Sequence, residues 1–263
     1  MGTSAMPFLF GLVAGALGGL MGVGGGILLV PLLVHLLHAE QHEAQGTSLA
    51  FTTATALVAA FAYFREGNLD FVLAVYLTIG AVPGVLFGAA LARKLTARKL
   101  RQAFGVLILV TAVRILIAAP MHTDVPRVWD PPWNILLGAL VGAFAGLVGI
   151  GGGTILVPIL VLGQRIPQHV AQGVSLLMIL PTGIVGALSH ARHGHIVRAL
   201  LPGLMAGGAV GALLGALLAH RIESATLSRL FAVFLLPVSA QMIFGRQRDN
   251  VPGSSKRSGG SPR

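Results

Sequence analysis

Hydroxyl and amide side chains stand at matching places in two segments that are otherwise apolar. The strings QHEAQGTSL (41–49) and QHVAQGVSL (168–176) share seven of nine residues, and further hydroxyls follow each string at helical spacing. Such groups donate hydrogen bonds to an oxyanion, but in a membrane helix they also bond their own backbone four residues back. Because the set is duplicated, we interpret it as a binding seam. The candidate substrate-binding side chains are Gln45, Ser48, Thr52, Thr55, Gln172, Ser175 and Thr182, and we expect each glutamine just before its helix.

A cluster of glycines interrupts an apolar run before each polar set. The first run reads GLMGVGGGILLVP (19–31) and the second reads GLVGIGGGTILVP (146–158). Because glycine is a poor helix former, the first run divides into a helix of about 22 Å at Pro7–Met21 and one of about 16 Å at Ile27–Leu37, against a bilayer core of about 30 Å. The second helix begins inside the membrane, where its free N–H groups and positive dipole end attract an anion. The candidate residues there are Gly24, Gly25, Gly26, Gly151, Gly152, Gly153 and Thr154.

Close helix packing is the alternative explanation for glycines in a membrane protein. Glycines four residues apart form one smooth helix face, and for these we expect packing rather than binding. Such sets occur at 11, 15 and 19, at 138, 142 and 146, and at 80, 84 and 88. The consecutive triplets form no such face, so we assign them to the site.

All eight acidic residues lie outside the apolar runs, whereas cation sites and proton relays commonly hold a carboxylate inside the membrane. The site therefore suits an anion or an uncharged solute better than a metal ion. The string HARHGH (190–195) has spacing that could bind a metal. However, we expect Ser189 and His190 to begin a loop without carboxylate or thiol partners, and we predict no metal site.

Three further polar side chains lie near the predicted site. His42 and His169 either contact the ligand or are polar groups at the mouth of the site, and we favour the second interpretation. Arg114 is the one basic residue well inside an apolar run. Its side chain either extends outward to the membrane surface or draws anions along the pathway.

The composition is that of a membrane protein, because 55% of the 263 residues are hydrophobic and only 10% are charged. Soluble domains carry about 25% charged residues. Several runs without charged residues approach or exceed the about 20 residues that cross a bilayer. We predict an all-α polytopic membrane protein. The net charge of +10 comes from loops and the tail, so we interpret it as a topology signal and not as a nucleic-acid site.

The chain is an internal duplication with an offset of 127 residues. We predict a first repeat at 1–118, a linker at 119–133, a second repeat at 134–245 and a basic disordered tail at 246–263. Each repeat is expected to hold a glycine-broken hairpin and three spanning helices. Duplications of this kind are typical of transporters that bind substrate near the bilayer midplane, although channels and some membrane enzymes are duplicated too.

The orientation of the two repeats depends on whether the glycine breaks are re-entrant turns. If they are, the repeats are inverted, and 12 basic residues lie on the side of loop 93–101 against five on the other. If each broken segment crosses the membrane instead, the repeats are parallel and the division is 8 against 9. The positive-inside rule favours inversion, a preference that depends on the basic residues of the tail.

Motifs of enzymes and cofactor sites do not match. The glycine cluster is not G-x-G-x-x-G, since Ile27 and Thr154 occupy the final position, and the sequence contains no G-x-S-x-G. We therefore expect no enzymatic activity and no cofactor.

The paired G-x-G-G-G-x-[IL]-x-V-P segments and the QGxSL strings resemble the TauE/SafE family of sulfite exporter-like permeases, also called the toluene-sulfonate uptake permease family. The resemblance implies a multi-pass permease of the bacterial or archaeal cell (inner) membrane for sulfite, organosulfonates or related sulfur-containing anions. An anion-selective channel of the same architecture is the alternative. The expected partners are a small anionic substrate and the lipid bilayer, with a homodimer and a coupling proton left open.

Overall fold

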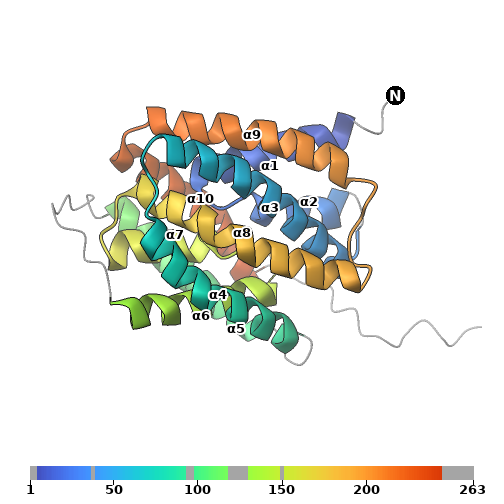
Figure 1. Ribbon diagram of the computed structural model, residues 1–263, viewed down its shortest axis with the longest axis horizontal. Helices are drawn as coiled ribbons and strands as arrows, with labels where there is room; N and C mark the ends of the chain where they lie inside the picture. The colour runs from blue at the N-terminus through green and yellow to red at the C-terminus, as the bar shows by residue number, and fades with distance from the viewer. Residues whose placement is uncertain (1–4, 37–38, 93–97, 118–129, 149–150, 245–263) are drawn as a thin grey trace, which may run out of the picture.

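The computed structural model describes residues 5–36, 39–92, 98–117, 130–148 and 151–244, and these contain helices and no strand (Figure 1). Most of the predicted linker (119–129) and the whole predicted tail (246–263) lie outside the described residues. The helices are α1 (Ala5–Met21), α2 (Gly26–Leu36), α3 (Gln41–Arg65), α4 (Phe71–Ala92), α5 (Arg98–Ile117), α6 (Pro131–Val148), α7 (Gly153–Gly163), α8 (Gln168–Arg192), α9 (Leu201–Arg221) and α10 (Ser224–Phe244).

The helix bounds of the two halves correspond at the offset of 127 residues. The bounds of α2 and α3 match those of α7 and α8 residue for residue, and the other three pairs agree within three residues. Because α6 begins at Pro131, it begins three residues before the predicted start of the second repeat at 134. Equivalent helices can therefore be compared position by position.

Five helices in the described part of the chain are long and apolar enough to cross a membrane, namely α3, α4, α8, α9 and α10. Many large apolar side chains are exposed on them, as expected of surfaces that face lipid. Phe61 on α3 and Leu214 on α9 are examples, with 60% and 57% of their surface exposed. The prediction of an all-α polytopic membrane protein is confirmed.

Two helix pairs pack through the regularly spaced glycines, and each pair joins the two halves of the chain. A Cβ atom added at Gly11, Gly15 or Gly19 of α1 would overlap the α9 backbone at 204, 208 and 212, in that order. The glycines at 138, 142 and 146 of α6 meet α4 at 77, 81 and 85 in the same manner. The packing interpretation of these glycines is confirmed. Because contact positions rise together, α1 runs parallel to α9, and α6 to α4.

The pair α3 and α8 lies between these two outer pairs (Figure 1). Gly46, near the start of α3, faces His190 near the end of α8, whereas Gly173, near the start of α8, faces Tyr63 near the end of α3. The two helices are therefore antiparallel. In the pair α5 and α10, the Gln102 amide donates a 3.1 Å hydrogen bond to the Ile243 carbonyl, so the first turns of α5 contact the last turn of α10.

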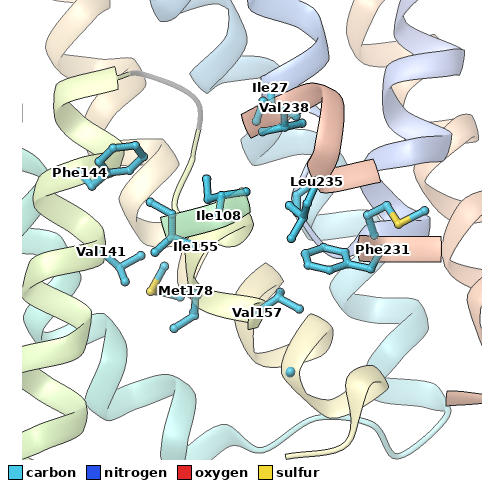
Figure 2. Packing of buried hydrophobic residues seen from close by; sticks show 14 of the residues in the cluster. Ile27, Ile108, Val141, Phe144, Ile155, Val157, Met178, Phe231, Leu235 and Val238 are labelled. Carbon is cyan, nitrogen blue, oxygen red and sulfur yellow. The ribbon is translucent and has the colours of Figure 1, made fainter. Parts of the chain in front are cut away.

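The short helix α7 is enclosed by other helices. Its residues from Gly153 to Pro158 are all buried. Figure 2 shows Ile155 and Val157 of α7 among apolar side chains of α5, α6 and α8, in one cluster with side chains of α2 and α10. Gly151 and Gly152, which precede α7, are buried as well, and irregular backbone in a membrane protein is tolerated where protein surrounds it.

Candidate functional site

The first glycine cluster breaks the helix as predicted, and the chain turns back on itself there. Helix α1 ends at Met21 and α2 begins at Gly26. Gly22, Gly24 and Gly25 have φ values of 68°, 73° and 80°, a left-handed region that favours glycine. A Cβ atom at Gly25 would meet the Ala14 carbonyl, so the start of α2 lies against α1.

The second break has a different backbone conformation. Gly151, the counterpart of Gly24, has φ of 76°, but Gly152 has φ of −82° and ψ of −9° and caps α7 in an ordinary helical conformation. Its counterpart Gly25 is left-handed. Residues 149–150 of the predicted motif lie outside the described residues. The two half-sites are therefore unequal at this position.

The two breaks lie against each other in the protein interior. From the position of a Cβ atom added at Gly153, the Gly22 carbonyl oxygen and Val23 Cα are each 3.0 Å away, and Ser175 Oγ is 2.7 Å away. Residues 22–26 and 151–153 are buried. The structure therefore brings together the glycine candidates of both repeats.

In the first repeat, the predicted hydroxyl donors already have partners in the protein. Ser48 Oγ donates a 3.2 Å hydrogen bond to the Gly26 carbonyl, and Thr55 Oγ1 lies 2.7 Å from the Gly24 carbonyl. Thr52 Oγ1 donates to the Leu49 carbonyl of its own helix at 3.0 Å. Because a hydroxyl has one proton, none of the three is a free donor, and Ser48 and Thr55 hold the turn.

The second repeat has free hydroxyls at the equivalent place. Thr154 and Ser175 are 1% and 0% exposed, and neither Thr154 Oγ1 nor Ser175 Oγ has a hydrogen-bond partner among the described residues. Thr154 replaces the apolar Ile27 of the first break, and Ser175 is the counterpart of Ser48. Thr182 is partnered, since its hydroxyl donates to the Met178 carbonyl at 2.8 Å.

Gln45 and Gln172 lie within helices and not before them, contrary to prediction. Helices α3 and α8 begin four residues earlier because Glu40 forms a capping box with Glu43 and Pro167 stands at the N-cap of α8. Both glutamines are buried. Gln172 reaches across to the first break, where its amide donates to the Leu20 carbonyl at 3.2 Å.

Tyr63 joins this arrangement although its role was not predicted. It is fully buried, and its hydroxyl donates a 2.8 Å hydrogen bond to Gln172 Oε1 and lies 3.3 Å from the Gly19 carbonyl. Tyr63 is also the counterpart of His190 at the offset of 127 residues. A comparison of the two repeats could therefore have singled out this pair of polar positions.

A narrow cleft leads away from the second break between α3, α4, α6 and α8. Gly151, Thr52, Thr182 and His190 line it, and its cavity volume is about 10 Å³, space for about one water molecule. His190 was predicted to begin a loop, but it lies within α8. Helix α8 continues to Arg192, as α3 continues to Arg65.

The remaining candidates lie away from the two breaks. His169 Nε2 is 3.0 Å from the Ala219 carbonyl, His42 is exposed near the start of α3, and the Arg114 side chain is exposed on α5. Among the described residues, no group of three or more histidine and acidic side chains has an arrangement that could hold a metal ion.

Comparison with known proteins identifies the family. The model of the family "Sulfite exporter TauE/SafE" matches residues 7–259. The probable membrane transporter protein YunE of Bacillus subtilis (strain 168) is 28% identical over 265 residues, which cover 90% of this chain and 96% of the relative. A probable membrane transporter protein of Xylella fastidiosa (strain 9a5c) is 31% identical and covers 89% of this chain and 92% of its own length.

An archaeal relative extends the comparison. The probable membrane transporter protein MJ0441 of Methanocaldococcus jannaschii is 29% identical over 200 residues, or 70% of this chain and 72% of its own. No solved structure matches the chain. Since the family match spans nearly the whole sequence and the structure has several apolar spanning helices, this multi-pass membrane protein belongs to the TauE/SafE family of membrane transporters.

Proposed function

We propose that this protein is a secondary transporter that moves small sulfur-containing anions, such as sulfite or organosulfonates, across the membrane. The names of the relatives support transport as the activity, and the name of the family supports sulfite and its chemical relatives as the substrate class. The substrate binds where the two glycine breaks meet, with the N-terminus of α7 as its main anchor.

The observation that carries this proposal is the pair of free hydroxyls at the start of α7. A buried donor without a partner costs about 1–3 kcal/mol, so Thr154 Oγ1 and Ser175 Oγ favour a ligand that accepts hydrogen bonds. The free N–H groups in the first turn of α7 and the positive end of its helix dipole favour the same kind of ligand. Eight acidic residues in the whole chain, all outside the apolar runs, leave this place free of competing carboxylates.

We also propose that residues 1–118 and 134–245 are inverted repeats. The antiparallel course of equivalent helices supports this, since α3 runs against α8 and α5 against α10. The fold-back of α2 on α1 supports a re-entrant first break. By the positive-inside rule, the end of the molecule that carries His42, Arg192 and Arg198 then faces the cytoplasm.

The size of the cleft fits alternating access. A cavity of about 10 Å³ does not admit an anion of several heavy atoms, so passage through this cleft requires helices to move. Alternating access provides that movement, and saturation of the flux distinguishes it from a gated channel.

Flux into proteoliposomes tests the proposal, with sulfite, sulfate, thiosulfate and methanesulfonate supplied with and without a pH gradient. We expect saturable flux of at least one of these anions. Ser175→Ala and Thr154→Val each remove one donor, and loss of a hydrogen bond to a charged group predicts about tenfold slower flux at low substrate.

Ser239→Ala is the matched control, because the Ser239 hydroxyl is buried but bonds the Leu236 carbonyl of its own helix at 2.7 Å. It is expected to leave flux unchanged. Wild-type flux that does not saturate would favour a channel. Full activity of both Ser175→Ala and Thr154→Val would contradict the proposed site.

A further inference from the structure

We propose that His42, His190, His193 and His195 form a binding site for a small oxyanion at the mouth of the cleft. The site deepens the function proposed above and rests on it for the identity of the anion. An anion binds at this site before it enters the cleft, and the affinity of the site for anions rises as the pH falls.

The four histidines come together from two parts of the chain. His42 lies near the start of α3, and the other three lie at the end of α8 and just beyond it. The ring of His195 is central, with ring centroids 5.4 Å from His42 and 6.0 Å from both His190 and His193. Gly46 permits this approach, because a Cβ atom there would overlap the His195 carbonyl.

The charges around this cluster are mainly positive or titratable to positive. His42, His190 and His193 surround His195, and Glu40, two residues before His42, is an exposed acid at the N-cap of α3. Glu43 is the nearest acid along α3, but its carboxylate accepts the Glu40 N–H at 3.2 Å and so caps its own helix. The side chains that α4 contributes to the cleft are Val85, Leu86 and Ala89. The segment 189–200 contains Arg192 and Arg198 and no acid.

His190 connects the cluster to the interior. It lines the same cleft as Thr52, Thr182 and Gly151, so an anion that leaves the cluster reaches the second break along this wall once the helices have moved apart. Its Nδ1 atom is buried and has no hydrogen-bond partner among the described residues. His193 differs, since its Nδ1 lies 2.7 Å from the Ser189 carbonyl and is already used.

The opposite end of the α3–α8 pair is lined differently. There Tyr63 takes the place of His190, and its hydroxyl bonds Gln172 Oε1 and lies 3.3 Å from the Gly19 carbonyl. The two histidines at that end, His169 and His220, each place one ring nitrogen against a backbone carbonyl. The pseudo-equivalent ends therefore differ in having a hydrogen-bonded tyrosine at one and His190 at the other.

The ligand class follows from these groups. Protonated imidazole gives both a positive charge and N–H donors, which suit a sulfonate or another small oxyanion. The described histidine and acidic residues are not arranged for a metal ion. Because imidazole gains its charge between about pH 8 and about pH 5, anion binding strengthens over that interval.

The test is calorimetric titration of the full chain in lipid nanodiscs with methanesulfonate, sulfate and thiosulfate, anions whose charge is constant between about pH 5 and about pH 8. We expect at least one to bind about tenfold more tightly at the lower pH, a factor at the lower end of a charged hydrogen bond. His195→Gln, at the centre of the cluster, removes this tightening. His220→Gln, at the opposite end, keeps it and is the matched control.

The outcomes separate this inference from the proposed function. Equal titrations of wild type and His195→Gln would overturn the inference, as would loss of binding after treatment with a chelator. The absence of binding to all three anions would also overturn it. Acid-enhanced binding without any wild-type flux would support the histidine site and count against transport. Flux with a pH profile unchanged by His195→Gln would support transport and count against the site.

Discussion

Alanine at Gly25 is expected to destabilise the protein much more than alanine at Gly152, although the two glycines are equivalent in the repeats. Gly25 has φ of 80°, and a left-handed conformation costs an alanine about 1–2 kcal/mol. Its Cβ atom would also lie 2.9 Å from the carbonyl carbon of Ala14, and overpacking against backbone costs about 1–3 kcal/mol. The expected loss of unfolding free energy is therefore about 2–5 kcal/mol.

Gly152 has neither problem in the same degree. Its φ of −82° suits any residue, and an added Cβ would meet the side-chain ends of Val141 at 2.6 Å and Met178 at 2.9 Å. Overpacking is expected to cost about 1–2 kcal/mol of unfolding free energy. Alanine offsets about 0.4–1 kcal/mol of this cost because it lowers the conformational entropy of the unfolded chain. The two variants thus differ by about 2–4 kcal/mol.

Thermal unfolding of both purified variants in detergent measures this difference. At about 2–4 °C per kcal/mol, the Tm of Gly25→Ala is expected roughly 5–15 °C below that of Gly152→Ala. Gly67→Ala separates strain from crowding, since Gly67 has φ of 72° with nothing within 4 Å of an added Cβ. Its expected loss is about 1–2 kcal/mol. Equal Tm values for Gly25→Ala and Gly152→Ala would refute the assignment of unequal backbone conformations to the two breaks.

Three other substitutions test the packing around the breaks. Tyr63→Phe removes the donor to Gln172, and the expected loss of unfolding free energy is about 1–3 kcal/mol, measured from Tm. An unchanged Tm would contradict the contribution of this hydrogen bond. Thr55→Val removes the 2.7 Å hydrogen bond to the Gly24 carbonyl and is expected to lower the unfolding free energy by about 1 kcal/mol. Thr111→Val is the control, because the exposed Thr111 hydroxyl bonds only its own helix. Gly15→Leu introduces a side chain against the Gly208 backbone, so we expect loss of folded protein in size-exclusion chromatography, and recovery of a monodisperse peak at wild-type yield would argue against the α1–α9 contact.

The helix breaks were predictable because their cause is local. Consecutive glycines disfavour a helix wherever they occur, so α1 and α2 end and begin within two residues of the predicted pieces at Met21 and Ile27. Helix ends set by polar residues were less predictable. HARHGH has the composition of a loop, yet α8 continues through His190, and the repeat offset from Arg65 would have predicted this.

The partners of the hydroxyls were not predictable from spacing. Ser48 and Ser175 occupy equivalent positions, but Ser48 bonds the Gly26 carbonyl while Ser175 has no partner among the described residues. That difference depends on how each serine is packed against the start of the preceding short helix, which spacing in the sequence does not reveal. The role of Tyr63 is likewise tertiary, because its bond to Gln172 spans 109 residues.

The pairing of α1 with α9 and of α4 with α6 gives the molecule an interlocked construction. The first helix of each half finds its glycine-matched surface on the fourth helix of the other half, and not within its own. An ancestral polypeptide of half this length would therefore satisfy that surface only by exchange with a second copy, which makes a swapped dimer the natural precursor of the fused gene. During synthesis, α1 likewise has no partner for its glycine face until α9 has been made.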